Sequence, residues 1–104
     1  MTTFKEANFR SKLDALSESQ QSIQTLCHWV VFHRKACKES AHIWAQQTLK
    51  APSERHLLYI YLANDILQNA RAKGSKGLEF LQEYGTQLKS VMPAVFASAK
   101  SETV

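Results

Sequence analysis

Apolar residues recur along most of this chain at the three- and four-residue spacings of amphipathic helices. No stretch of useful length alternates apolar and polar positions as a half-buried strand does. The pattern predicts a first helix from Thr3 to Leu16 and a second that begins after Ser19, whose hydroxyl can cap its first turn. We therefore expect an all-α protein.

Three further helices follow from the same pattern. The phase shifts around Cys37 to Ser40, which indicates a turn before a third helix; Pro52 then stops that helix, and Ser53 is placed to cap a fourth from Glu54 to Ala72. Gly74 is placed to end the fourth helix in a left-handed conformation. A fifth helix follows, kinked or restarted at Pro93. Short loops between antiparallel helices favour a compact bundle or a right-handed superhelix.

Composition places these helices in one small domain. The chain has 104 residues, 44% apolar and 21% charged, which suffices for a single hydrophobic core. Thirteen Lys and Arg against nine Asp and Glu leave a net charge of +4, a mild bias toward acidic partners. This composition excludes collagen-like, coiled-coil, transmembrane and disulfide-scaffold classes.

The two cysteines and the terminus bear on the compartment. If one helix carries both Cys27 and Cys37, they lie about 15 Å apart, whereas a disulfide needs Cα atoms within about 7 Å. We therefore expect reduced thiols. The N-terminus lacks the apolar run of a signal peptide, and the longest apolar run, Leu57 to Ala63, is too short to span a bilayer. The cytosol or the nucleus is expected.

A polar strip interrupts the fourth helix, which is otherwise apolar nearly all round. Tyr61, Asp65 and Asn69 follow one another at four-residue spacing, and Asn64 and Gln68 do the same beside them. Polar groups on a buried helix cost free energy unless they find partners. Two explanations stay open: an internal network that ties helices together, and a groove that recognises the backbone and hydroxyl groups of a peptide.

Basic residues follow the strip directly. Arg71, Lys73 and Lys76 either complement the helix dipole at a solvated end or steer an acidic or phosphorylated ligand toward the groove. A second basic cluster, Arg34 and Lys35 with Lys38, is interpreted as a plain surface face.

Catalysis and metal binding find little support. Cys27, His28, His33 and Cys37 lack the spacing of a zinc site, and no glycine-rich phosphate loop, nucleophile elbow or carboxylate pair is visible. We expect no catalytic residues, no metal and no cofactor. Trp29 and Trp44 are interpreted as core anchors.

The motifs around these residues resemble a known family. Leu26-Cys-His-Trp29, His33-Arg34-Lys35 and above all Tyr61-Leu-Ala-Asn-Asp-Ile-Leu-Gln-Asn69 are similar to the CTD-interacting domain, which binds the C-terminal repeats of the largest RNA polymerase II subunit. The regulators of nuclear pre-mRNA domain-containing proteins and related termination factors are the nearest in likeness. The resemblance covers about residues 4 to 92. It implies one domain over residues 1–104, a right-handed superhelix related to VHS and ENTH domains, and a chain that lacks the last helices of the family.

The resemblance also implies a nuclear, non-catalytic reader of phosphorylated heptad repeats, Tyr-Ser-Pro-Thr-Ser-Pro-Ser, in transcription termination or 3′-end processing. It assigns Asp65 to the tyrosine hydroxyl of the repeat, Tyr61 and Ile66 to the apolar slot for its ring, and Asn64, Asn69 and Gln20 to the peptide. Arg71 and Lys73 would add positive potential near the phosphates. Glu18 stands where relatives often carry Asn, and an acid there disfavours a phosphate nearby.

Two other functions stay open. A VHS/ENTH-like trafficking adaptor would bind sorting peptides, ubiquitin or acidic lipids, and for lipid it would need a basic amphipathic N-terminal segment. That segment offers only Lys5 and Arg10. Direct binding of nucleic acid through the positive charge is not expected, because exposed aromatic residues do not interleave with the basic ones.

Overall fold

The chain folds into helices throughout the part that the structure describes. In this computed structural model, residues 4–103 are described, with side chains for residues 4–97, and these residues contain no strand. The predicted all-α class is confirmed. The elements are α1 (Glu6–Asp14), α2 (Gln20–Phe32), the 3₁₀ turn η1 (Arg34–Ala36), α3 (Cys37–Lys50), α4 (Ser53–Ala72), the 3₁₀ turn η2 (Gly74–Gly77) and α5 (Leu78–Thr103).

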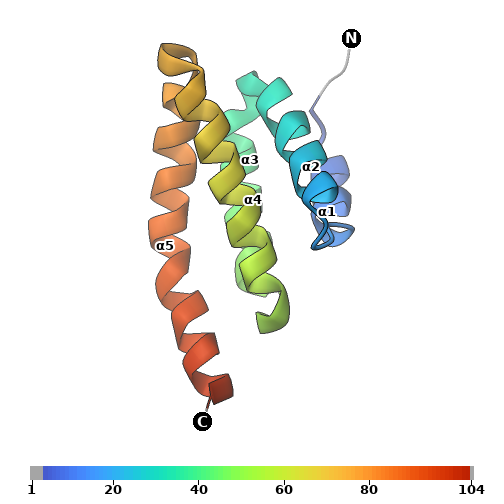
Figure 1. The fold of residues 1–104 in the computed structure, drawn as a ribbon, viewed down its shortest axis with the longest axis vertical. Helices are drawn as coiled ribbons and strands as arrows, with labels where there is room; N and C mark the ends of the chain where they lie inside the picture. The colour runs from blue at the N-terminus through green and yellow to red at the C-terminus, as the bar shows by residue number, and fades with distance from the viewer. Residues whose placement is uncertain (1–3, 104) are drawn as a thin grey trace.

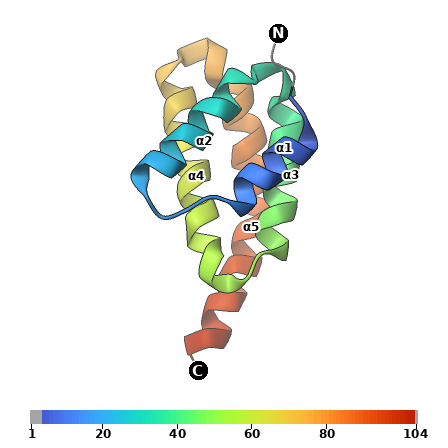
Figure 2. The same ribbon diagram turned by 90° about the vertical axis from the view of Figure 1, so that its right-hand side faces the viewer.

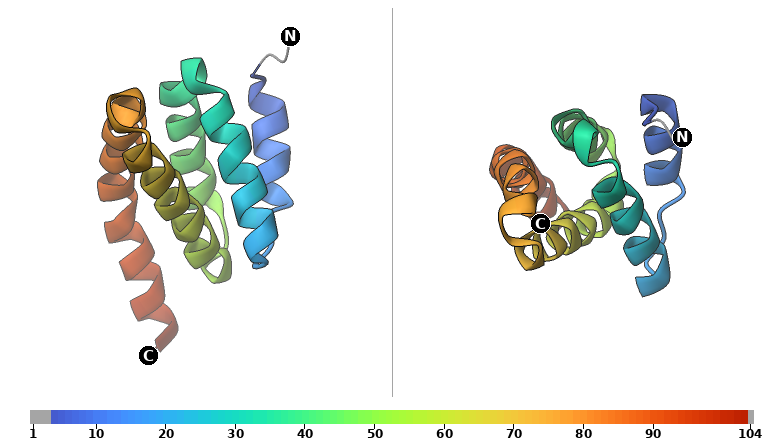
Figure 3. Two further views of the ribbon diagram at one scale, coloured as in Figure 1. Left: turned by 45° about the horizontal axis from the view of Figure 1, so that its top comes forward. Right: turned by 90° about the horizontal axis from the view of Figure 1, so that it is seen from above.

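The long helix α5 packs along both α3 and α4, and the other two helices flank that pair (Figure 1). α1 packs on α3 and α2 packs on α4, so that α2 and α4 are neighbours although α3 separates them in sequence (Figure 2). The view from above shows α5 and α1 at opposite ends of the assembly (Figure 3). In this arrangement α4 packs against α5 and also against α2.

The core joins α3, α4 and α5 through aromatic residues. Trp44 is fully buried, and its indole Nε1 donates a hydrogen bond to the Tyr59 carbonyl oxygen at 3.0 Å. The buried Tyr84 hydroxyl donates to Ser40 Oγ at 2.8 Å, which ties α5 to α3. Trp29 lies at the edge of the core, where its ring stacks on Phe9 at 5.6 Å between centroids. The expected role of both tryptophans in the core is confirmed.

Several predicted boundaries are wrong, for local reasons. The first helix begins at Glu6, because Lys5 is extended and the Phe4 ring packs against Trp29 at 5.5 Å; Thr3 lies outside the described residues. The break before α3 comes at His33, with φ −89° and ψ 56°, earlier than the predicted turn. Pro52, not Ser53, is the N-cap of α4.

Other local predictions are confirmed. Ser19 caps α2 by accepting a hydrogen bond from the Ser22 amide at 3.1 Å. Gly74 has a φ of 63° directly after the end of α4, as predicted for a left-handed terminator. One alternative for the fifth helix is wrong: α5 continues through Pro93 as one helix and does not restart there. Within the described residues, none of the helices has the length and apolar character that crossing a membrane requires.

Candidate functional site

A cavity of about 220 Å³ opens between the start of α2 and the middle of α4. Its position follows from the Ser19 cap, which fixes the first turn of α2, and from the packing of α2 on α4. The residues that line it are Glu18, Gln20, Ile23, Tyr61, Asn64 and Asp65. Four of the residues predicted to bind a peptide therefore come together here from two helices.

Asp65 supplies the distinctive chemistry of this cavity. Its side chain is half-buried, and within residues 4–97 no hydrogen bond or ion pair reaches its carboxylate. Its charge acts on the buried Cys27 thiol of α2, so the carboxylate faces the boundary between the two helices. A half-buried carboxylate without a partner can accept hydrogen bonds from a hydroxyl or amide donor.

Asn69 lies one turn beyond Asp65 on α4, where α4 contacts α2. Its Nδ2 donates hydrogen bonds to the Asp65 carbonyl oxygen at 3.0 Å and to Cys27 Sγ at 3.4 Å. Burial, and then the Asp65 charge, raises the pKa of Cys27 to about 12, so the thiol stays protonated. With both amide hydrogens engaged, Asn69 presents its Oδ1 as the group that remains for a ligand.

These contacts bear on the two explanations of the polar strip. Among Tyr61, Asn64, Asp65, Gln68 and Asn69, the last alone has a side-chain hydrogen bond within the described part of the chain. Tyr61 is 51% exposed, although it belongs to an apolar helix. Tyr61, Asn64 and Gln68 are thus directed outward, whereas Asn69 links α4 to α2 through Cys27.

A second cavity, of about 450 Å³, lies at the other end of the same helix pair. Two apolar aromatic residues and four basic side chains border it, with Asn69 between this cavity and the first. The lining residues are His28, Val31, Phe32, Arg34, Asn69, Lys73, Lys76 and Phe80. We name this region the basic cavity and the first one the carboxylate cavity. The surface along α2 and α4 that holds both cavities is called the groove.

The turn η2 positions the lysines of the basic cavity. Gly74 adopts a positive φ that residues with a side chain rarely tolerate, and Gly77 lies against the end of α4. A Cβ at Gly77 would stand 1.9 Å from the Ala70 carbonyl oxygen. Both glycines are therefore needed for the turn that brings Lys76 back toward α2.

Sequence reasoning missed Arg34 and His28 as members of this site. The sequence predicts Arg34 on a plain surface. If the second helix continued past His33, Arg34 and His28 would lie on different faces of it. The break at His33 instead turns the chain into η1 and brings Arg34 to the cavity. The irregular hydrophobic phase before Cys37 was the available signal.

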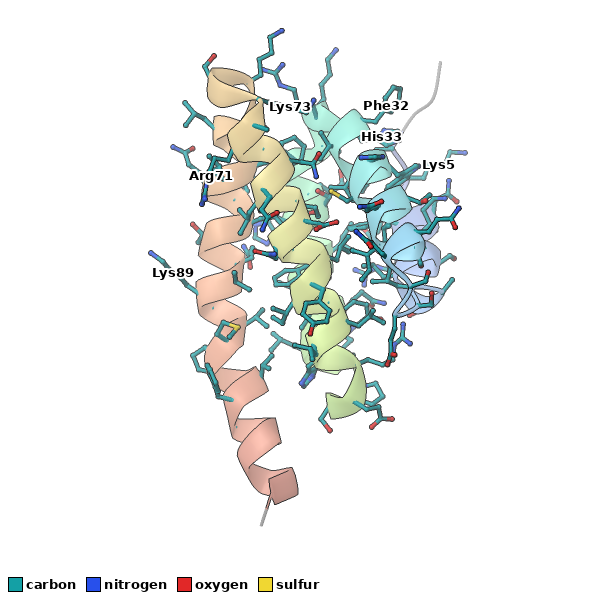
Figure 4. The ribbon with its side chains drawn as sticks, viewed as in Figure 1. Lys5, Phe32, His33, Arg71, Lys73 and Lys89 are labelled. Atoms are coloured by element: carbon teal, nitrogen blue, oxygen red, sulfur yellow. The ribbon has the colours of Figure 1, made fainter. Side chains whose placement is uncertain are left out.

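Two predicted site residues lie elsewhere. Ile66 has no exposed surface and belongs to the core, so it supports the groove from beneath and does not line it. Arg71 is exposed, but it projects beside α5, on the side of α4 away from α2, whereas Lys73 stands at the end where α2 and α4 finish (Figure 4). Lys73 thus belongs to the groove and Arg71 does not.

The histidines and cysteines do not form a metal centre in the described residues, where no three His, Cys, Asp or Glu side chains are arranged to hold an ion. Cys27 and Cys37 are buried free thiols on different helices. His33 packs against the Trp29 ring at 4.5 Å between centroids.

Comparison with known proteins gives the family. The CID domain profile matches residues 7–104. Human regulation of nuclear pre-mRNA domain-containing protein 1A is 39% identical over 103 residues, which cover 99% of this chain and 31% of that protein. Human regulation of nuclear pre-mRNA domain-containing protein 1B is 42% identical over 88 residues, 85% of this chain and 26% of that protein. The chain spans less than a third of the length of these relatives. The family match includes both α2 and α4. This chain therefore belongs to the CID (CTD-interacting domain) family.

Proposed function

We propose that this domain is a non-catalytic module that binds phosphorylated heptad repeats of the RNA polymerase II C-terminal domain, in nuclear transcription termination or pre-mRNA 3′-end processing. The observation that carries the proposal is the unpaired, half-buried Asp65 carboxylate in a cavity between α2 and α4. Membership of the CID family supplies the class of ligand.

In this proposal the repeat tyrosine enters the carboxylate cavity. Asp65 accepts the hydrogen bond of the phenol, while Tyr61 and Ile23 provide the apolar walls for its ring. Gln20 and Asn64 face the same space and can pair with peptide amides on either side. Asn69 offers its Oδ1, and Lys73 supplies positive charge close to the peptide, whereas Arg71 acts on it only through long-range potential.

Fluorescence anisotropy with a labelled two-repeat peptide tests the proposal. Peptides with and without phosphate on the first serine of the repeat should bind the folded domain, and a peptide with Phe in place of each Tyr should bind at least tenfold more weakly, because the half-buried Asp65 carboxylate then loses its partner. Failure of every heptad peptide to bind a protein with native circular dichroism would refute the function.

Charge variants separate contact from general electrostatics. Asp65→Asn keeps the shape of the side chain and should lower the affinity for the Tyr peptide about tenfold or more. Glu54→Gln removes an equal charge from the exposed first turn of the same helix, and it should leave the affinity unchanged. Equal losses in the two variants would show that Asp65 acts through bulk charge and not through contact.

A further inference from the structure

The basic cavity has the composition of a site for an anion. His28, Arg34, Lys73 and Lys76 all line it, and they come from α2, η1, the end of α4 and η2. No acidic side chain lines it. A solvated helix end accounts for basic residues on that helix alone. It does not explain why basic side chains from four separate elements line one cavity.

From this arrangement we infer that the basic cavity is a subsite for a phosphate monoester carried by the peptide in the groove, at a fixed distance from the group that Asp65 binds. The inference rests on the proposed function and adds a second point of recognition to it. Arg34 provides a planar donor pair for two phosphate oxygens, and Lys73 and Lys76 add ammonium donors.

Apolar side chains form part of the lining of the cavity. Phe80 is buried at its wall and Val31 is half-buried, so part of the ligand would be shielded from water. Phe32 stands at the rim with 71% of its surface exposed (Figure 4). The four basic side chains themselves are exposed, so their attraction for a phosphate should weaken as the salt concentration rises.

The acids nearest along α5, Glu79 and Glu83, are not among the residues that line the cavity. Glu79 and Glu83 act on the buried Cys37 thiol, whose pKa is raised to about 12 by burial first and by these two charges next. Between Asp65 and Glu79 the sequence contains no acid. The basic cavity therefore keeps its positive charge without a competing carboxylate in its lining.

The two ends of the groove have opposite charge. Glu18 and Asp65 line the carboxylate cavity, which repels a phosphate, and the basic cavity attracts one. A peptide should therefore bind best when its phenol occupies the carboxylate cavity and its phosphate occupies the basic cavity. This polarity selects the position of the phosphate and not merely its presence.

The spacing follows from helix geometry. Lys73 follows Asp65 by eight residues along α4, or about 12 Å at the rise of an α-helix. An extended peptide advances about 3.3 Å per residue, so about four residues separate the two recognised groups. In the heptad repeat, the fourth residue after the tyrosine is the second serine, and the fourth residue before the next tyrosine is the threonine.

Peptides that differ in phosphate position test the inference. Phosphoserine four residues after the tyrosine, or phosphothreonine four residues before it, should give the larger gain in affinity over the unphosphorylated peptide, and phosphoserine next to the tyrosine the smaller. In the double variant Arg34→Gln/Lys76→Gln the ratio of phosphorylated to unphosphorylated affinity should fall roughly tenfold for the four-residue peptides. Lys89→Gln, an exposed lysine on α5, is the single-charge control and should not change that ratio (Figure 4).

The outcomes separate this inference from the proposed function. An unchanged ratio in the double variant, or an equal gain from a phosphate next to the tyrosine, overturns the subsite while peptide binding stands. A separate NMR titration of the free domain with O-phosphoserine should shift the amides of η2 and His28 first. If no shift appears there, or if free phosphoserine shifts the carboxylate cavity instead, the basic cavity is not the anion site, whatever the peptides do.

Discussion

The side-chain amide of Asn69 on α4 donates a hydrogen bond to the Cys27 sulfur on α2 at 3.4 Å, beneath the groove. This contact joins α2 to α4 beside the basic cavity, one helical turn beyond Asp65 of the carboxylate cavity. The same Nδ2 also donates to the Asp65 carbonyl oxygen one turn earlier in α4. The orientation of Asn69 is therefore set before any ligand arrives, with its carbonyl left for the peptide.

Removing this amide should cost both stability and affinity. Asn69→Ala is expected to lower the free energy of unfolding by about 1 kcal/mol and to weaken peptide binding, since neither the link to Cys27 nor the free acceptor remains. Urea denaturation and anisotropy measure the two effects. Gln68→Ala changes an exposed neighbour on the same helix and should alter neither quantity. A wild-type affinity in Asn69→Ala would show that the residue only links helices.

Stability should fall as the pH rises above about 9. Burial raises the pKa of both Cys27 and Cys37 from 9.0 to about 12, and burial also raises that of the Tyr84 phenol. Between pH 9 and 12 the unfolded chain releases protons that the folded chain keeps, so the unfolded state gains stability with rising pH. Urea midpoints at pH 7, 8, 9 and 10 measure this. In the double variant Cys27→Ala/Cys37→Ala the decline should be shallower, and an equally steep decline would contradict the assignment.

Two glycines should respond to alanine in opposite directions. Gly77→Ala forces a Cβ against the Ala70 carbonyl and should lower the free energy of unfolding by about 1–3 kcal/mol. At Gly85, inside α5, a Cβ meets no atom within 4 Å, so Gly85→Ala should raise it by about 0.5–1 kcal/mol. Thermal denaturation of the two variants decides the matter. A stabilised Gly77→Ala would mean that η2 adjusts freely.

Arg55 should stabilise the end of α1 from a distance. Its Nη2 lies within hydrogen-bond distance of the carbonyl oxygens of Leu13, Asp14 and Leu16, at 3.2, 3.2 and 3.0 Å. A cation at the C-terminus of a helix satisfies unpaired carbonyls and complements the dipole. Arg55→Ala should therefore lower the free energy of unfolding by about 1–2 kcal/mol and speed hydrogen exchange in α1. Lys38→Ala, at an exposed site on α3, serves as the control.

Glu18 should limit how closely a phosphate can approach the carboxylate cavity. Glu18→Gln removes one of its two acids, so the affinity for a peptide phosphorylated next to its tyrosine should rise about twofold to fivefold at low salt. The gain should shrink at high salt because the side chain is exposed. Glu54→Gln controls for net charge, and a similar gain in that variant would remove Glu18 from the explanation.

Signals that act within one helix were readable from the sequence. The cap at Ser19, the left-handed Gly74 and the strip from Tyr61 to Asn69 depend on neighbours three or four residues away, and each was predicted correctly. Helical spacing alone therefore predicted that Tyr61, Asp65 and Asn69 share one face of α4.

Features that depend on packing between helices were not readable. Ile66 is adjacent to Asp65 in sequence, but one residue along a helix rotates the side chain by about 100°, which directs it into the core. At the break, His33 is buried and its ring packs against Phe4, a residue 29 positions earlier in the chain, at 5.8 Å between centroids, a contact that local spacing does not reveal. Without that break, Arg34 cannot be placed in the basic cavity.

The groove lies between α2 and α4, two helices that contact each other only after the chain has passed through α3 and returned. An unfolded chain therefore holds no part of the recognition surface in place, and a peptide that binds selects the native state. By mass action, ligand at one hundred times its dissociation constant stabilises such a domain by about 2.7 kcal/mol. Occupancy of the groove and resistance of the domain to unfolding are thus linked, and a rise in melting temperature reports binding without any label.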